Sequence, residues 1–319
     1  AVHCDVFRKG VIALPTVSTV YEVPLILEEE GLGDLMVGSL DLLSSPKDLV
    51  GWRAMVERMQ SPKDVLSIAV VGKYVELRDS YLSVKESLDH AGLALECDIE
   101  LQWVGAEDIE EHGADAYLGQ VSGIVVPGGF GPRGIEGMID TVRYARDNAI
   151  PYLGLCLGLQ VMVIEAARGP LGLATANSTE FDPDTPDPVI DLMPDQRDLT
   201  DMGGTMRLGV YPCRVVKGSW AERAYARPLI QERHRHRYEV NNAYREALES
   251  VGMWPTGISP DGRLVEIMEW PGHPFMVGVQ FHPEFLSRPD RPHPLFREFV
   301  GVAIQTLREG GQHALPIEA

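Results

Sequence analysis

The chain has 319 residues, 45% of them hydrophobic, which is typical of one large folded domain with an extension. Its formal net charge of −19 argues against binding to nucleic acid or to anionic membranes, because their phosphate groups would repel it. The four cysteines (Cys4, Cys97, Cys156 and Cys213) are widely spaced and form no Cys-x-x-Cys pair, so they indicate a reducing cytoplasm and predict no metal site.

A helix is predicted after residue 44. Ser45 is a candidate N-cap and Pro46 suits the first helical position. Apolar residues then recur on one side of the helix, at Leu49, Trp52, Met55, Val56 and Met59. We interpret residues 44–64 as a linker helix between two domains.

Strands and helices alternate over the next hundred residues. Residues 66–71 form a continuous apolar run, which is typical of a strand in a parallel sheet covered on both faces. The further predicted elements are helix 80–91, strand 99–104, helix 106–112, strand 123–126, helix 134–148, a strand ending at Leu155, and helix 157–168. This order predicts an α/β fold with a doubly wound, mostly parallel sheet flanked by helices, and a site at the carboxyl ends of its strands.

The pattern is less regular after residue 177. Residues 182–204 are rich in Asp and Pro and are interpreted as a surface lid. Strands are predicted at 207–216, 264–270 and 275–281, with an antiparallel arrangement, and a closing helix at 294–309. The main domain is therefore expected to span residues 65–312, with a tail at 313–319.

The sequence Gly154-Leu155-Cys156-Leu157-Gly158 joins a short apolar strand directly to a helix. The two glycines leave room for a sharp turn that exposes the residue at its tip. Serine hydrolases of the α/β class use such a turn for their nucleophile. The N–H groups that open the helix point toward the reacting group. This geometry predicts that Cys156 is a nucleophile.

Two further segments fit a cysteine nucleophile. The strand that ends at Phe281 is followed by His282, Pro283 and Glu284. Alone, His-Pro-Glu indicates an ordinary surface loop, but beside the cysteine turn it predicts a base with its orienting carboxylate. The glycine-rich turn at 127–131 suits an oxyanion hole, although alone it also fits a phosphate cradle or an ordinary turn.

Together these motifs resemble the class I, or triad, glutamine amidotransferases. The resemblance rests on Pro-Gly-Gly-Phe-Gly at 127–131, Gly-Leu-Cys-Leu-Gly-Leu-Gln at 154–160 and Gln-Phe-His-Pro-Glu at 280–284. Within that class the chain is similar to the CTP synthase family in three more stretches: Asn-Ser-Thr-Glu-Phe at 177–181, Gly-Gly-Thr-Met-Arg-Leu-Gly at 203–209 and Arg-His-Arg-His-Arg-Tyr-Glu-Val-Asn at 233–241.

The resemblance implies a role for each site residue. Cys156 would attack the side-chain amide of L-glutamine, His282 would transfer the proton, and Glu284 would orient the imidazole. The N–H groups of Gly129 and Leu157 would form the oxyanion hole. Glutamine would also contact Gly158, Leu159, Gln160, Glu180 and Arg237. Among Arg233, Arg235 and Arg237, the choice of Arg237 follows from the resemblance alone.

The resemblance also implies that the chain is part of a larger ligase of pyrimidine biosynthesis, in which ammonia from glutamine aminates ATP-activated UTP to CTP. Residues 1–43 would be the C-terminal remnant of the synthetase domain, a second α/β domain, in which Val6 is a weak candidate for ATP contact. ATP and magnesium would belong to the missing part of that domain, with no cofactor in this chain. GTP would be an activator, although the 194–203 segment is shorter than in other members of the family, which argues against a response to GTP. The full enzyme would be a cytoplasmic homotetramer.

Two other readings compete with this one. The chain could be a non-catalytic docking or assembly module, which the presence of all three triad residues opposes. It could instead be another triad amidotransferase or a γ-glutamyl hydrolase, which the Arg-His-Arg-His-Arg run and the N-terminal segment oppose.

Overall fold

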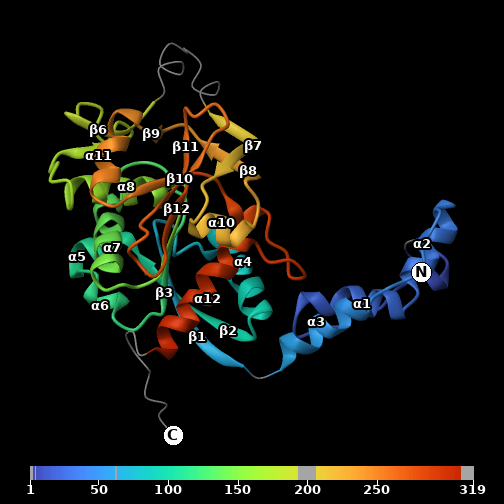
Figure 1. Ribbon diagram of the computed structural model, residues 1–319. Helices are drawn as coiled ribbons and strands as arrows, with labels where there is room; N and C mark the ends of the chain where they lie inside the picture. The colour runs from blue at the N-terminus through green and yellow to red at the C-terminus, as the bar shows by residue number, and fades with distance from the viewer. Residues whose placement is uncertain (1–2, 4, 62, 193–205, 310–319) are drawn as a thin grey trace, which may run out of the picture. The chain divides into compact units, whose positions relative to one another are not determined.

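The computed structural model describes residues 3, 5–61, 63–192 and 206–309 (Figure 1). The chain forms two compact units, residues 1–62 and residues 63–319. No helix in these described ranges is both long and apolar enough to cross a membrane.

The first unit is helical over its described residues, with α1 (Val23–Glu29), α2 (Leu32–Leu40) and α3 (Val50–Gln60). The indole N–H of Trp52 in α3 donates to the carbonyl of Tyr21 at 2.8 Å. No strand occurs among these described residues. The boundary between 1–43 and 44–64 remains a prediction.

The predicted start of the linker helix is wrong. Helix α3 begins at Val50, and Ser45 does not cap it. The carboxylate of Asp48 accepts the N–H of Val50 at 3.2 Å, which supplies a capping bond closer to the apolar stripe.

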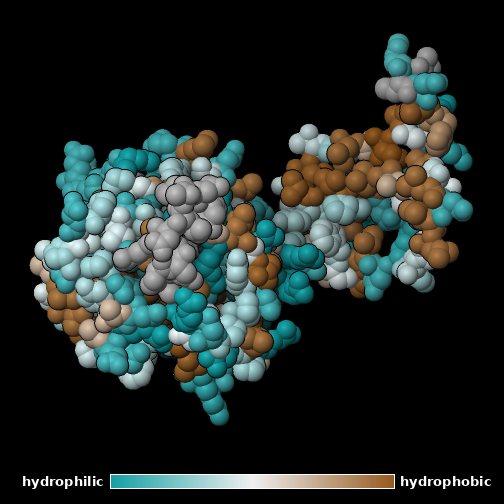
Figure 2. Space-filling view, turned by 90° about the horizontal axis from the view of Figure 1, so that it is seen from above, coloured by the Kyte–Doolittle hydropathy of each residue, from teal (hydrophilic) through white to brown (hydrophobic). Residues whose placement is uncertain are grey.

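Apolar side chains are widely exposed on the first unit, as the brown areas of Figure 2 show. Phe7, Leu40 and Leu43 are examples, and among the described residues of this unit only Met55 and Val56 are buried. A unit that buries so little apolar surface has a small hydrophobic contribution to its own stability.

The second unit contains a nine-stranded sheet in the order β2-β1-β3-β4-β12-β11-β10-β7-β8. The strands are β1 (Asp64–Gly72), β2 (Cys97–Gly105), β3 (Gly123–Val126), β4 (Tyr152–Leu155), β7 (Arg207–Val215), β8 (Leu229–His236), β10 (Trp254–Ile258), β11 (Val265–Glu269) and β12 (Met276–Val279). Pairing is parallel from β2 to β12 and antiparallel from β12 to β8. The doubly wound α/β prediction is confirmed.

Helices cover both faces of the sheet (Figure 1). Strand β1 is buried on both sides, with Ala69 and Val71 in one apolar cluster and Ile68 and Val70 in the other. The first cluster includes α5 (Ala106–His112), α7 (Ile135–Asp147) and α8 (Leu157–Arg168). The second includes α4 (Leu82–Ala94), α10 (Trp220–Tyr225) and α12 (Pro294–Arg308). A strand buried on two faces must be apolar throughout, which explains the continuous run at 66–71.

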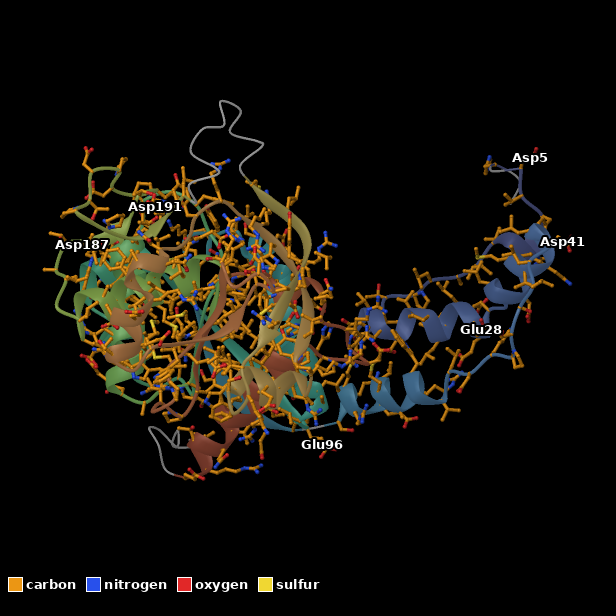
Figure 3. All side chains as sticks on the ribbon, turned by 45° about the horizontal axis from the view of Figure 1, so that its top comes forward. Asp5, Glu28, Asp41, Glu96, Asp187 and Asp191 are labelled. Atoms are coloured by element: carbon orange, nitrogen blue, oxygen red, sulfur yellow. The ribbon has the colours of Figure 1, made fainter. Side chains whose placement is uncertain are left out.

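A second sheet of three short strands corrects the lid prediction. It consists of β5 (Ala176–Ser178), β6 (Asp187–Asp191) and β9 (Glu239–Val240), with α11 (Arg245–Ser250) farther along the chain. Strand β6 lies within the predicted lid because Val189 and Ile190 are fully buried in the same cluster as α8. Its end residues Asp187 and Asp191, labelled in Figure 3, accept hydrogen bonds from threonine hydroxyls. The 194–203 segment lies outside the described residues.

Helices α5 and α7 approach each other at Gly137, and this contact provides a test of the packing. A methyl group there would lie 1.9 Å from the carbonyl oxygen of Ala106. Gly137→Ala is therefore expected to destabilise the protein by about 3 kcal/mol, which exceeds the gain of about 1 kcal/mol in helix propensity. Urea unfolding measures the difference, and Gly272→Ala is the control because no atom lies within 4 Å of the added methyl group there.

Candidate active site

Cys156 occupies a strained backbone position between β4 and α8, with φ 53° and ψ −97°. The turn requires glycine on both sides of it. A Cβ at Gly154 would lie 2.6 Å from the carbonyl group of Gly158, and a Cβ at Gly158 would lie 2.2 Å from the carbonyl oxygen of Val126. The Gly-x-Cys-x-Gly spacing is thus a steric requirement.

Hydrogen bonds hold this turn against the neighbouring strands. The N–H of Cys156 donates to the carbonyl of Val279 at 2.7 Å, and the hydroxyl of Tyr152 donates to the carbonyl of Gly158 at 2.8 Å. The sulfur lies at the N-terminus of the 12-residue helix α8. The dipole of a helix favours negative charge at its N-terminus.

His282 and Glu284 follow β12 and are both buried. The backbone N–H of His282 donates to the carbonyl of Arg233 at 2.8 Å, and the imidazole ring stacks on Phe285 with 5.4 Å between centroids. Its Nδ1 lies 2.7 Å from Oε1 of Glu284. Because a carboxylate accepts hydrogen bonds, this contact assigns a proton to Nδ1 and directs Nε2 to the other side of the ring.

The imidazole and the cysteine meet at Gly128. A Cβ built on Gly128 would lie 3.0 Å from Cε1 of His282 and 3.7 Å from Cβ of Cys156, so a larger residue would crowd the imidazole. No oxygen or nitrogen of the described residues hydrogen-bonds to Nε2 of His282. Burial lowers the pKa of His282, but the sulfur of Cys156 and the carboxylate of Glu284 outweigh it and raise this pKa to about 11. The side chains of Cys156 and His282 are therefore close enough to interact electrostatically.

The glycine-rich turn at 127–131 lies against the start of α8. A Cβ on Gly129 would be 3.1 Å from the side chain of Leu157. The N–H of Gly131 donates to Glu180 at 2.9 Å, and Nζ of Lys73 donates to the carbonyls of Phe130, at 3.3 Å, and of Gly131. Burial lowers the pKa of Lys73 to about 8, although the charge of Glu180 opposes this shift. Side chains on both sides thus fix the turn.

One cavity of about 280 Å³ is lined by Cys156, His282, Glu284 and the glycine-rich turn. Its lining consists of Tyr74, Ser80, Tyr81, Ser83, Val84, Pro127, Gly128, Gly129, Phe130, Cys156, Arg235, His282, Glu284 and Phe285. The predicted residues Cys156, His282, Glu284 and Gly129 are therefore brought together.

The other predicted residues have different positions. Gln160 is buried on α8 and donates to the carbonyl of Tyr238 at 3.0 Å, next to the half-buried Arg237. Gly158 and Leu159 are buried in α8, against β3 and β12 respectively. Val6 is 43% exposed in the first unit. Among the described residues no cluster of three or more His, Cys, Asp or Glu side chains could hold a metal ion.

The run Arg233-His234-Arg235-His236 forms the end of strand β8, an element that the sequence analysis did not predict. The strand period of two buries the two imidazoles and exposes the two arginines. Arg235 reaches the triad cavity. The alternation of arginine with histidine at 233–236 was the sequence signal for this strand.

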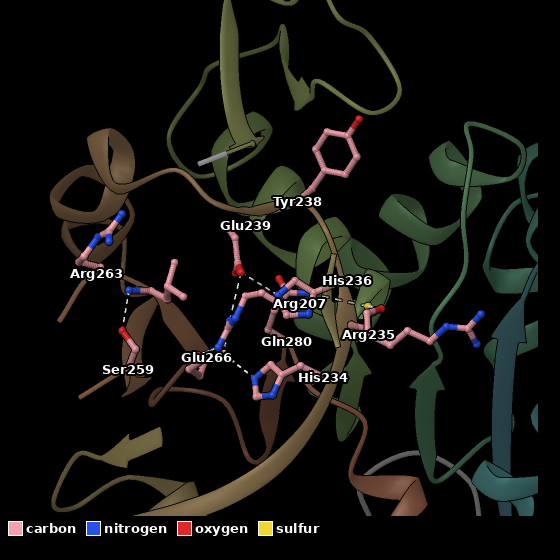
Figure 4. Close-up of polar contacts among 12 residues, drawn as sticks. Arg207, His234, Arg235, His236, Tyr238, Glu239, Ser259, Arg263, Glu266 and Gln280 are labelled. Carbon is pink, nitrogen blue, oxygen red and sulfur yellow. Dashed lines mark hydrogen bonds and ion pairs between the residues drawn. The ribbon is translucent and has the colours of Figure 1, made fainter. Parts of the chain in front are cut away.

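A buried ionic cluster lies under β8 (Figure 4). Arg207 contacts Glu266 at 2.9 Å and Glu239 at 3.1 Å, while Nε2 of His234 lies 2.8 Å from Glu266 and Nε2 of His236 lies 2.8 Å from Glu239. Burial would raise the pKa of Glu266, but His234 and Arg207 lower it to about 2. Its contribution to stability is therefore present above the unfolded pKa and is lost as the pH falls through 2.

The chain is similar to known proteins in both sequence and fold. A family model described as "Glutamine amidotransferase class-I" matches residues 76–302. A CTP synthase of Dehalococcoides mccartyi is 61% identical over 317 residues, 99% of this chain and 58% of the relative, and one of Roseiflexus sp. is 57% identical over 319 residues, 100% of this chain and 57% of the relative. The chain thus spans less than two thirds of the length of these relatives.

A solved structure titled "Trypanosoma brucei CTPS - glutaminase domain with bound acivicin" has a TM-score of 0.71 and 39% sequence identity. The match covers 75% of this chain and 94% of that one. The sequence match, the shared fold and the cysteine turn agree, and the chain belongs to the class I glutamine amidotransferase family.

Proposed function

We propose that the chain hydrolyses L-glutamine to glutamate and ammonia, and that Cys156, His282 and Glu284 are its catalytic triad. The observation that carries the proposal is the convergence of the three side chains on one cavity, with the sulfur on a strained turn at the N-terminus of a helix. That arrangement suits acyl transfer through a thiolate.

We propose one task for each group. The thiolate of Cys156 attacks the amide carbon, and the carbonyl oxygen becomes an oxyanion that the N–H groups of Gly129 and Leu157 stabilise. Each such donor is typically worth about 3 kcal/mol of barrier. His282 protonates the departing nitrogen, so ammonia leaves and a glutamyl thioester remains. Water, deprotonated by His282, then cleaves the thioester, which releases glutamate and restores the thiolate.

The amino-acid end of glutamine needs charged partners. Glu180 lies beside the glycine turn and is proposed to face the ammonium group. Arg237 is proposed to face the carboxylate, and the cavity position of Arg235 makes it the alternative. Gln160 uses its amide N–H to hold the backbone at Tyr238 and is proposed to position this side of the site.

We further propose that this chain is the glutaminase part of a CTP synthase, supported by the names of relatives that match nearly its whole length. In that enzyme the ammonia would aminate UTP at the expense of ATP and magnesium, with GTP as activator. Those sites, the contact at Val6, the homotetramer and the cytoplasmic location remain predictions.

The competing readings differ in what they require of the site. A docking module needs no buried His282–Glu284 contact of 2.7 Å beside a strained cysteine. A γ-glutamyl hydrolase would act on γ-glutamyl peptides rather than on free glutamine, so the substrate preference separates it from the present proposal.

Replacing the nucleophile tests the function directly. Cys156→Ala is expected to lower glutamine hydrolysis by about three orders of magnitude or more, because no covalent intermediate can form. Ammonia release from glutamine is the measurement. The matched control is Cys97→Ala, a second buried cysteine outside the cavity. Equal activity of Cys156→Ala and the intact protein would rule out the nucleophile.

The titration of His282 tests the coupling of the triad. Folding raises its pKa from about 6.5 in an unfolded chain to about 11, so the interaction stabilises the protein fully below the lower value and is lost as the pH rises through the higher one. Cys156→Ala removes one of the two side chains that raise the pKa of His282. The titration midpoint of His282 is therefore expected to fall by more than one pH unit.

Histidine NMR signals measured against pH follow this midpoint. His273 is the internal control, because its pKa is lowered by burial and its partners are the backbone groups of Ala145 and Phe275. An identical His282 midpoint with and without the sulfur would contradict the coupling.

A further inference from the structure

Gln280 contacts the sulfur of Cys156, and the triad leaves this contact unexplained. Gln280, labelled in Figure 4, lies in the segment between β12 and His282. Its side chain is fully buried, and its Nε2 lies 3.8 Å from Sγ of Cys156. Its backbone N–H donates to the carbonyl of Glu266 at 2.9 Å, which fixes the main chain next to the buried ionic cluster.

A chain of hydrogen bonds determines which end of the Gln280 amide faces the sulfur. The carbonyl of Tyr238 can only accept, so the group of Gln160 that lies 3.0 Å from it must be its NH₂. The same NH₂ lies 3.5 Å from Oε1 of Gln280. A flipped Gln280 would place its NH₂ against that of Gln160, two donors facing each other, and its oxygen against the sulfur. The unflipped amide therefore directs its N–H at Cys156.

An N–H donor at this point favours the ionised sulfur. Hydrogen bonds to a charged group are stronger than those to a neutral one, and inside a protein they are weakened little by solvent. The carbonyl of Arg235 lies 4.0 Å from Sγ and acts in the opposite direction, because it can accept only from the neutral S–H group. The N–H of the Gln280 amide offsets the preference of that carbonyl for the neutral thiol, and it does so without adding a buried charge.

We propose that Gln280 is a further catalytic residue, whose side-chain amide donates a hydrogen bond to the Cys156 sulfur and stabilises its thiolate form. Gln160 acts through Gln280 as a positioning residue, because it sets the orientation of the amide. The proposal deepens the glutaminase mechanism above and rests on it.

The test is the pH dependence of Cys156 alkylation by iodoacetamide, in which the thiolate sulfur forms a bond to carbon and iodide leaves. Gln280→Glu replaces the donor by an acceptor of the same shape, and Gln280→Met removes the donor at similar volume. Both variants are expected to move the alkylation midpoint to higher pH, by about one unit for Gln280→Glu, which makes the reaction about tenfold slower below the midpoint.

Mass analysis of the Cys156 peptide separates this reaction from that of other thiols. Burial raises the pKa of Cys97 to about 11 and that of Cys213 well above its usual range, so neither competes near neutral pH. The control is Gln102→Glu, because Gln102 contacts Ser67 at 2.9 Å in the sheet, outside the cavity. It is expected to leave the midpoint unchanged.

Turnover separates a failure of this proposal from a failure of the glutaminase function. Gln280→Met should lower kcat for glutamine more than it raises KM, since the amide contacts the nucleophile. Active variants whose alkylation midpoint matches that of the intact protein would overturn the role of Gln280 and leave the glutaminase assignment in place. If the variants shift the midpoint but the intact protein releases no ammonia from glutamine, the role of Gln280 as a donor is retained and the glutaminase function is overturned. Circular dichroism checks folding, and Gln280→Met carries the test where Gln280→Glu does not fold.

Discussion

The backbone of Cys156 is the constraint on which the site depends. A non-glycine residue at φ 53° and ψ −97° costs of order 1–3 kcal/mol, and the surrounding structure must hold it there. The N–H of Cys156 is bonded to β12, and residues 157–167 of the following helix are buried. The strained conformation directs the sulfur toward the helix N-terminus and the cavity. In a relaxed strand the sulfur would instead be buried within the sheet.

The parallel half of the sheet could be predicted because its signals are local. Helices 106–112 and 157–168 and strand 123–126 were predicted with the bounds that the structure has. Continuous apolar runs indicate strands buried on both faces, and glycines mark the turns between them. The cysteine turn was visible for the same reason, since the close approach of Gly154 and Gly158 is a contact between residues four positions apart.

In the antiparallel half, where strands near 207–216, 264–270 and 275–281 are predicted and found, strand β8 was missed because it depends on a partner distant in sequence. Strand β8 buries the imidazoles of His234 and His236 on one face. This burial is possible because Glu266 and Glu239 lie opposite the two imidazoles. Nothing near residue 234 in the sequence announces a carboxylate from residue 266. The role of Gln280 was hidden in the same way, because it follows from contacts with residues 156 and 160.

Strand β8 connects this ionic cluster to the chemistry. The carbonyl of Arg233 accepts the backbone N–H of His282, and the carbonyl of Arg235 lies 4.0 Å from the sulfur, so the strand's main chain contacts both Cys156 and His282. A shift of its register by one residue would move the imidazoles out and the arginines in, away from the charges that match them. A buried carboxylate such as Glu266 without a partner is strongly destabilising, so the cluster tolerates one register only. The buried charges therefore favour the register in which the carbonyls of Arg233 and Arg235 lie beside His282 and Cys156.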